Sequence, residues 1–208
     1  MNASAALNDL AWNLEMEFRR YSQRVRPPEN PIFDYDLSFP LGAQKMAARL
    51  GYWIFPGTSE NIRKVTHWWG YPAEPPSLPL IQKWWDGENR SCPIAAALGP
   101  SDITVVEILD VGDMRAFRAL AQWEDTFGRL PRTRIVKTPK GYQIHMRGSM
   151  SARKCGVHDG LALKSWSDWI ALPGTHDGEV PYRWLRVGDL EPTPDWLMGP
   201  RKNLSTRD

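Results

Sequence analysis

The sequence has few of the residues that build disulfide and zinc sites. Its 208 residues include two cysteines, Cys92 and Cys155, and four histidines that are scattered along the chain. Two distant cysteines provide neither a disulfide framework nor a zinc-binding spacing, so a reducing, cytoplasmic environment is expected. The histidine spacing gives no reason to expect zinc either. The phosphate loop GxxxxGK[ST] and the patterns GxGxxG, CxxC, HExxH and GxSxG are all absent, which removes the signatures of many common enzyme classes.

Long apolar runs and a strong net charge are also missing. No run approaches the roughly 20 residues of a membrane-spanning helix, and the first residues, MNASAALNDLAW, lack the basic-then-apolar order of a secretory signal. We therefore expect no membrane partner. The 26 basic and 24 acidic residues give a net charge of +2, so a nucleic-acid surface would have to be a local patch.

The most regular stretch, Ser101–Arg147, predicts a strand, a helix and a hairpin. Ile103–Leu109 is β-branched and apolar around one charge, Glu107, and is expected to be a strand. Apolar residues then recur at helical spacing from Met114 to Phe127, with Asp113 as the expected N-cap. The helix should end at the glycine and proline that follow.

The predicted hairpin carries a polar stripe. Arg134–Lys137 and Tyr142–Arg147 are short runs joined by a Pro-Lys-Gly turn. Alternate residues of a strand face opposite ways, so the polar residues of the second run should share one face. They are Gln143, His145 and Arg147. We expect Glu107 to meet this stripe across a sheet and to mark a site.

The remaining segments predict short elements around this stretch. An amphipathic helix is expected near residues 5–24, followed by a proline-rich extension. The other expected elements are helices at 41–50 and 80–85 and strands at 52–55, 94–98, 160–164, 169–172 and 181–186, with a turn at 173–178. The tail should pack through Trp196 and Leu197. We expect three parts: an N-terminal extension (1–40), a central domain (41–187) and a C-terminal tail (188–208).

Eleven tryptophans are many for this length, and most are expected in the core. One basic, aromatic loop stands apart, since Lys64 and a neighbouring arginine precede His67, Trp68 and Trp69. Interleaved cations and aromatics bind nucleic acid through phosphate contacts and stacking. The alternative is a tryptophan pair that closes the edge of the core, with the cations in solvent.

The order of these pieces resembles the N-terminal primase–polymerase (Prim-Pol) domain of bifunctional DNA primase/polymerases, in the archaeo-eukaryotic primase superfamily. The matching pieces are MAARLGYWIFPGTSENIRK, LIQKWWDGENRSCPIAAALGPSDITVVEILDV, LAQWEDTFGRLPRTRIVKTPKGYQIHMR and GLALKSWSDWIALPGTHDGEVPYRW. The resemblance implies an α+β fold with a mostly antiparallel sheet flanked by helices, to which the N-terminal helix would be an addition. It also implies nucleotidyl transfer, in which Mg²⁺ or Mn²⁺ held by carboxylates bridges the triphosphate.

The chain departs from this family at each position that would hold the metal or the triphosphate. Where the family has Asp-x-Asp, the chain has Glu107 and Leu109. Gln143 replaces the hairpin histidine, although His145 lies two residues further on the same face. Ala162 replaces the third aspartate. One glutamate is a poor two-metal cage, so we expect little or no templated polymerase activity and no bound cofactor.

A cleft of this kind still offers positive charge and hydrogen-bond donors. With carboxylates replaced by neutral groups, phosphate could be held without metal. The candidate nucleotide- or nucleic-acid-binding residues are Lys64, Thr138, Lys140, Gln143, Arg147 and Lys164. An alternative stays open for four residues. In it, Lys140 is a solvated turn lysine, Arg147 is a cation at the hairpin end, and His145 is a hydrogen-bonded sheet histidine. Glu107 is then paired with Lys or Arg across the sheet.

Three functions remain. In the first, a degenerate Prim-Pol domain binds nucleotide or single-stranded or primed DNA in a replication-associated or regulatory role, beside a helicase or another replication protein in trans. In the second, the chain is an active primase–polymerase that uses Glu107, as catalytic residue and metal ligand, with Asp110 or Asp113, Mg²⁺ or Mn²⁺, and His145. In the third, the cleft is closed and the chain is a protein-interaction module.

Overall fold

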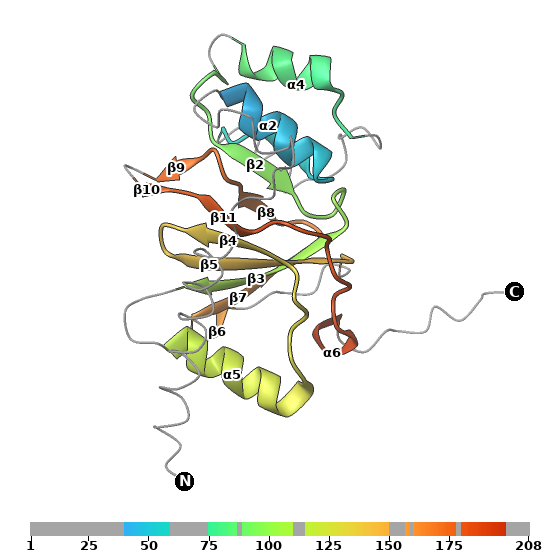
Figure 1. The fold of residues 1–208 in the computed structure, drawn as a ribbon, viewed down its shortest axis with the longest axis vertical. Helices are drawn as coiled ribbons and strands as arrows, with labels where there is room; N and C mark the ends of the chain where they lie inside the picture. The colour runs from blue at the N-terminus through green and yellow to red at the C-terminus, as the bar shows by residue number, and fades with distance from the viewer. Residues whose placement is uncertain are drawn as a thin grey trace, which may run out of the picture.

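The computed structural model describes residues 40–58, 75–86, 89–109, 115–149, 157–158, 160–177 and 180–198. Helices and antiparallel sheets form an α+β fold (Figure 1), which confirms the predicted fold class. Several predictions lie outside the described residues: the N-terminal helix, the basic loop with Lys64, and the roles of Asp110 and Asp113. Within the described part of the chain, no helix has the length and apolar character needed to cross a membrane.

A six-stranded antiparallel sheet forms the centre of the fold. Its strands in spatial order are β11 (Arg183–Arg186), β4 (Arg134–Thr138), β5 (Gly141–Arg147), β3 (Ile103–Leu109), β7 (Leu161–Lys164) and β6 (Val157–His158). The predicted hairpin is therefore present as β4 and β5. The predicted strand around Glu107 is β3, and it lies between β5 and β7.

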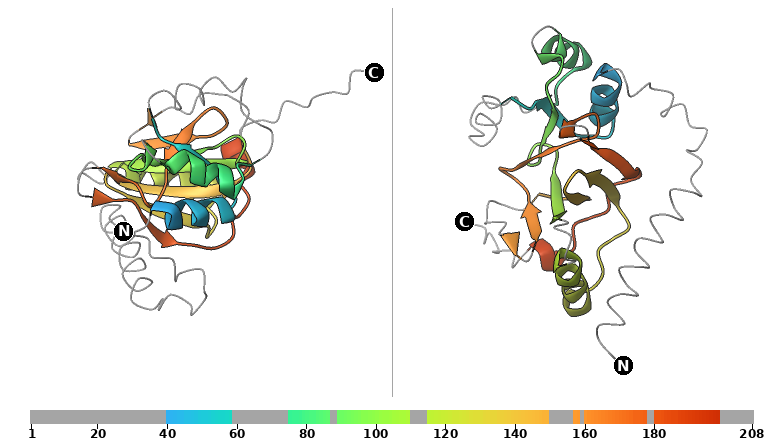
Figure 2. Two further views of the ribbon diagram at one scale, coloured as in Figure 1. Left: turned by 90° about the horizontal axis from the view of Figure 1, so that it is seen from above. Right: turned by 90° about the vertical axis from the view of Figure 1, so that its left-hand side faces the viewer.

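A smaller three-stranded antiparallel sheet adjoins it. Its members are β1 (Trp53–Pro56), β2 (Ile94–Ala97) and β8 (Trp169–Ala171). Helices α2 (Pro40–Arg49) and α4 (Leu78–Trp85) contact each other and β1. They lie on the opposite side of the molecule from α5 (Arg115–Phe127) in Figure 1 and in the right-hand view of Figure 2.

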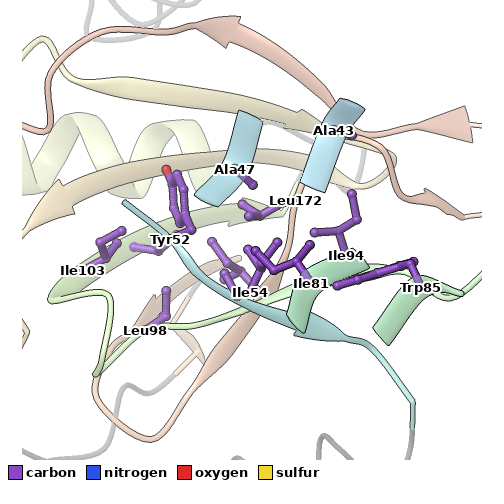
Figure 3. Close-up of a cluster of buried hydrophobic side chains, with 13 residues drawn as sticks. Ala43, Ala47, Tyr52, Ile54, Ile81, Trp85, Ile94, Leu98, Ile103 and Leu172 are labelled. Carbon is purple, nitrogen blue, oxygen red and sulfur yellow. The ribbon is translucent and has the colours of Figure 1, made fainter. Parts of the chain in front are cut away.

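The two faces of the large sheet enter different cores. Ile103 and Val105 of β3 join a cluster formed by α2, α4 and the small sheet, in which Ile54, Ile81 and Ile170 are buried. Figure 3 shows this cluster, with the hydroxyl oxygen of Tyr52 projecting out of it. The alternate β3 residues Val106 and Ile108 instead pack with α5, together with Met146, Leu161 and Leu197. The predicted alternation along the strands is thus confirmed.

Local sequence explains where the helices begin and end. The side chain of Ser77 caps α4 by accepting a hydrogen bond from Leu80 N at 3.4 Å, and a proline in the first turn needs no amide partner. The helix therefore begins at Leu78, two residues before the predicted start. After α2, Gly51 has a φ of 88°, a conformation that glycine adopts without strain.

The C-terminal segments differ from prediction in two respects. The single strand expected at 181–186 is split, because β10 (Val180–Pro181) pairs with β9 (His176–Asp177) whereas β11 pairs with β4. β9 also lies inside the predicted turn. In the tail, α6 (Asp195–Met198) buries Leu197 and packs Trp196 against the α5 cluster, as predicted. The three-part division of the chain stays a prediction, although Leu197 lies beyond the expected boundary at 187.

Candidate functional site

Glu107 lies at the centre of one row of residues across the large sheet. It is directly opposite Gln143 on β5 and Ala162 on β7. Gln143 is in turn opposite Val136, which is opposite Trp184 on β11. The positions that the resemblance aligns with the family's carboxylates and histidine therefore converge, as the strand pattern predicts. This row occupies the face of the sheet opposite α5.

A continuous chain of polar contacts runs from Glu107 into the core. Lys164 Nζ lies 2.7 Å from Glu107 Oε2, and Gln143 Nε2 donates to Glu107 Oε1 at 3.1 Å. The Gln143 amide oxygen then lies 3.3 Å from His145 Nε2, and His145 Nδ1 lies 2.6 Å from the Tyr52 hydroxyl. Glu107 is thus held by a cation and an amide, and His145 by an amide and a phenol.

The chemistry of these groups fixes the direction of the hydrogen bonds. The Gln143 amide nitrogen can only donate to the Glu107 carboxylate, so the amide oxygen is left to accept from His145 Nε2–H. Neutral His145 then has an unprotonated Nδ1, which accepts from the Tyr52 hydroxyl. Every contact in the chain has one donor and one acceptor, and the imidazole has both ring nitrogens engaged.

Burial keeps the inner end of this chain neutral. His145 is fully buried, and burial, followed by the positive charge of Arg134, lowers its pKa from 6.5 to about 3. Burial also raises the pKa of Tyr52 from 10.0 to about 12, an effect that the charge of Arg134 partly offsets. Charged forms lose solvation when buried, which explains both directions. At neutral pH both side chains are therefore uncharged.

Arg134 is a buried cation that the predictions did not include. Its guanidinium donates to Leu50 O at 2.8 Å and to Gly188 O at 2.7 Å, and it lies 5.5 Å from the centre of the Tyr52 ring. Strand pairing places Arg134 directly opposite His145, so the alternation of the hairpin contained the signal. Tyr52 was also missed. It precedes a strand of the other sheet, and nothing in the local sequence indicates that it reaches His145.

The described side chains do not fit a two-metal site. Both carboxylate oxygens of Glu107 already have a partner, and its neighbours on the adjacent strands are an amide and a methyl group. Within the described ranges, no group of three or more His, Cys, Asp or Glu side chains is placed to hold a metal ion. Mg²⁺ and Mn²⁺ prefer several hard oxygen ligands, and a lysine beside the single carboxylate opposes a cation.

The other predicted binding residues are spread over the sheet. Thr138 and Lys140 lie at the β4–β5 turn, where Lys140 N donates to Thr138 Oγ1 at 3.2 Å; Lys140 is exposed. Arg147 is exposed at the opposite end of β5, where it pairs with Ile103. The structure thus brings Lys164, Glu107, Gln143 and His145 together in one chain of contacts. Arg147 lies outside this chain.

The geometry also corrects one electrostatic expectation. Lys164 was expected to add positive charge to the cleft, yet its ammonium group forms an ion pair with Glu107. This pair agrees with the alternative interpretation of Glu107 as a carboxylate matched across the sheet. Buried or half-buried carboxylates need such a partner.

Comparison with known proteins identifies the family. The family model for the Prim-Pol domain, described as bifunctional DNA primase/polymerase, N-terminal, matches residues 43–196. No curated protein matches the chain significantly. The matched range includes both sheets and the whole polar chain from Tyr52 to Lys164, and it covers more than half of the sequence. The chain therefore belongs to the Prim-Pol family, a family of primase/polymerase-type nucleotidyltransferases.

Proposed function

We propose that this protein is a catalytically degenerate Prim-Pol domain that binds nucleotide or nucleic acid without a catalytic metal. One observation carries the proposal: Lys164 and Gln143 occupy the two carboxylate oxygens of Glu107, the single acid of the row. A cation is bound where the family's chemistry needs divalent metal, and Ala162 offers no ligand to a second ion.

The loss of carboxylates changes the sign of the charge that such a surface attracts. Two or three carboxylates repel phosphate unless metal ions lie between them. Here the charge of Glu107 is neutralised by Lys164. Exposed Lys140 lies at the β4–β5 turn, next to Thr138. A phosphate can approach this end of the sheet without metal, held by Lys140 and by donors at the turn.

The proposed ligands are nucleotide and single-stranded or primed DNA, in a replication-associated or regulatory role, and the proposed partner in trans is a helicase or another replication protein. The competing function is active nucleotidyl transfer. It would need Asp110 or Asp113 to join Glu107 and would need Lys164 to leave the carboxylate.

A primer-extension assay separates these two functions. The wild-type protein is incubated with a primed template and dNTPs in Mg²⁺ or Mn²⁺, beside the Glu107→Ala variant. We expect no extension by either protein. Extension by the wild type that disappears in Glu107→Ala would overturn the proposal and would establish an active centre.

Binding is measured separately, by fluorescence anisotropy of a labelled oligo(dT) at low salt. Lys140→Ala should weaken binding and reduce the salt dependence by about one phosphate contact. Arg118→Ala is the matched control, because Arg118 is exposed on α5, on the other side of the sheet. Absence of wild-type binding to oligo(dT) and to dNTPs would favour the third function, a protein-interaction module.

A further inference from the structure

The turn between β7 and β8 presents a tryptophan to solvent in an unfavourable backbone conformation. Trp166 is 45% exposed and has a φ of 31°, which places it in the left-handed region. Among the described non-glycine residues, Asp102 alone shares a positive φ. Large side chains rarely adopt this conformation, and it persists only where the surroundings impose it.

Hydrogen bonds on both sides impose it here. Gly99 N donates to Trp166 O at 3.0 Å. Asp168 closes the turn, since its amide donates to Ser165 O at 2.7 Å and its carboxylate accepts from Ser165 N at 2.9 Å. Asp168 O also accepts from Leu98 N at 3.1 Å. The turn is thus tied to the β2–β3 connection, and Trp166 is displayed on a rigid support.

A cation lies at the same end of the sheet. The hydroxyl of Thr104 contacts Gly148 O at 2.6 Å and Ser165 Oγ at 2.9 Å. One hydroxyl therefore joins the residue after Arg147 to the residue before Trp166. Arg147 is exposed at the end of β5 and Trp166 lies in the turn that follows β7, so the two stand at the same end of the strands that flank β3.

Two acidic residues of this end, Asp102 and Asp168, accept hydrogen bonds from their neighbours. Asp102 accepts from the amide and the hydroxyl of Ser149 at 2.8 and 3.1 Å, and Asp168 accepts from Ser165 N. Their charges still disfavour a surface that binds through phosphate alone. Stacking on an aromatic ring does not depend on net charge, and one cation suffices to hold a neighbouring phosphate.

We propose that Trp166 is a stacking platform for an unpaired base of a single-stranded nucleic acid, with Arg147 contacting a phosphate of the same strand. The site lies at the end of the sheet away from the β4–β5 turn. It rests on the proposed function and adds to it a specific ligand form, because only an unpaired base can expose its face to a tryptophan. Duplex DNA should bind this site poorly.

The test replaces Trp166 with glycine, which adopts a positive φ without the strain that tryptophan has there. Trp166→Gly relieves the left-handed backbone but loses the contacts of the buried part of the ring, so we expect little change in Tm. Binding of oligo(dT) should weaken by roughly 5- to 150-fold, the range for removal of one stacked base. Trp166→Asn, which also tolerates this conformation, gives a second variant, and Trp166→Phe should retain most of the affinity.

Two further variants make the result specific. Arg147→Gln should cause a smaller loss and lower the salt slope by about 0.7, as expected for one phosphate of a single strand. Phe127→Ala is the control, because Phe127 is a second exposed aromatic residue, 56% exposed and stacked on Trp196 at 5.5 Å beside α5. The Phe127→Ala variant should bind oligo(dT) as the wild type does.

The outcomes distinguish this site from the proposed function as a whole. If Trp166→Gly and Trp166→Asn bind oligo(dT) as the wild type does while Lys140→Ala binds more weakly, the stacking site is wrong and the proposed function stands. Equal losses in Trp166→Gly and Phe127→Ala would also overturn the site. Failure of the wild type to bind any nucleic acid or nucleotide would overturn both.

Discussion

The two faces of the large sheet are built from the same strands but differ in chemistry. Toward α5, β3 contributes Val106 and Ile108, which pack with Met146 and Leu161. On the other face, the alternate positions carry a chain of polar groups that begins at Lys164 and Glu107 and ends at Tyr52. Both faces are largely buried, so the difference between them is not one of solvent access.

The comparison shows what each face contributes. Burial of apolar side chains stabilises a fold at about 25 cal/mol per Å², whereas a buried hydrogen-bonded group gains little and costs much when its partner is removed. Apolar contacts, which on the polar face include Ile103 and Val105, are thus the main source of stability. The polar face costs little stability because every group in the chain of polar contacts has a partner. These contacts hold the side chains in one defined arrangement.

The largest effect is expected on the apolar face. Ile108→Ala should lower the free energy of unfolding by about 2–5 kcal/mol, because Ile108 is buried between β3 and α5 and leaves a cavity. Urea unfolding followed by circular dichroism measures this change. Val180→Ala, at an exposed residue, is the control and should stay within about 0.5 kcal/mol of the wild type. A loss below 1 kcal/mol for Ile108→Ala would contradict the comparison.

On the polar face, the inner end should respond next. Tyr52→Phe removes the donor to His145 Nδ1 and leaves a fully buried acceptor unpaired, which should cost about 1–3 kcal/mol of unfolding free energy. The ring contacts with His145 and Trp184 are retained, so packing changes little. A stability equal to that of the wild type would show that water or a tautomer change satisfies His145.

A third test uses pH, because burial lowers the pKa of His145 to about 3. Above pH 6.5 the imidazole is neutral in both states and contributes no pH dependence. Between pH 6.5 and 3 the unfolded chain binds a proton that the folded chain does not. Stability should therefore fall as pH falls, by up to about 1.4 kcal/mol per pH unit.

The variant His145→Gln isolates this contribution from the other titrating groups. Its amide oxygen can accept from Tyr52, but the side chain has no proton to gain. Unfolding free energies of both proteins, measured from pH 7 to pH 5, should show the wild type losing stability relative to the variant below pH 6.5. Parallel curves would mean that His145 titrates normally in the folded protein.

Sequence patterns predicted the polar row because its members lie on regular strands. The alternation in β5 and the position of Glu107 within β3 are enough to place Gln143 beside it, and antiparallel pairing then brings Ala162 to the other side. The same reasoning applied to Arg134 would have found the buried cation opposite His145. These contacts follow from periodicity.

Contacts between the two sheets do not follow from periodicity. Tyr52 reaches His145 from 93 residues away, from the position just before a strand that pairs with β2 rather than with β5. Strands β9 and β10 have two residues each, too few for any alternation to be recognised. The ion pair of Lys164 depends on a diagonal reach from β7 to Glu107, which strand register alone does not determine.

The smallest effect is expected at the outer end of the polar chain, where Lys164 and Glu107 meet. The Lys164 side chain is 32% exposed and that of Glu107 15%, so water and salt weaken their attraction. A double-mutant cycle of Lys164→Met and Glu107→Gln, followed by urea unfolding, should give a coupling energy of about 0.2–1 kcal/mol that falls in 1 M NaCl. A coupling above 2 kcal/mol that salt does not reduce would mean that the pair is effectively buried, and would make it a source of stability comparable to one buried apolar side chain.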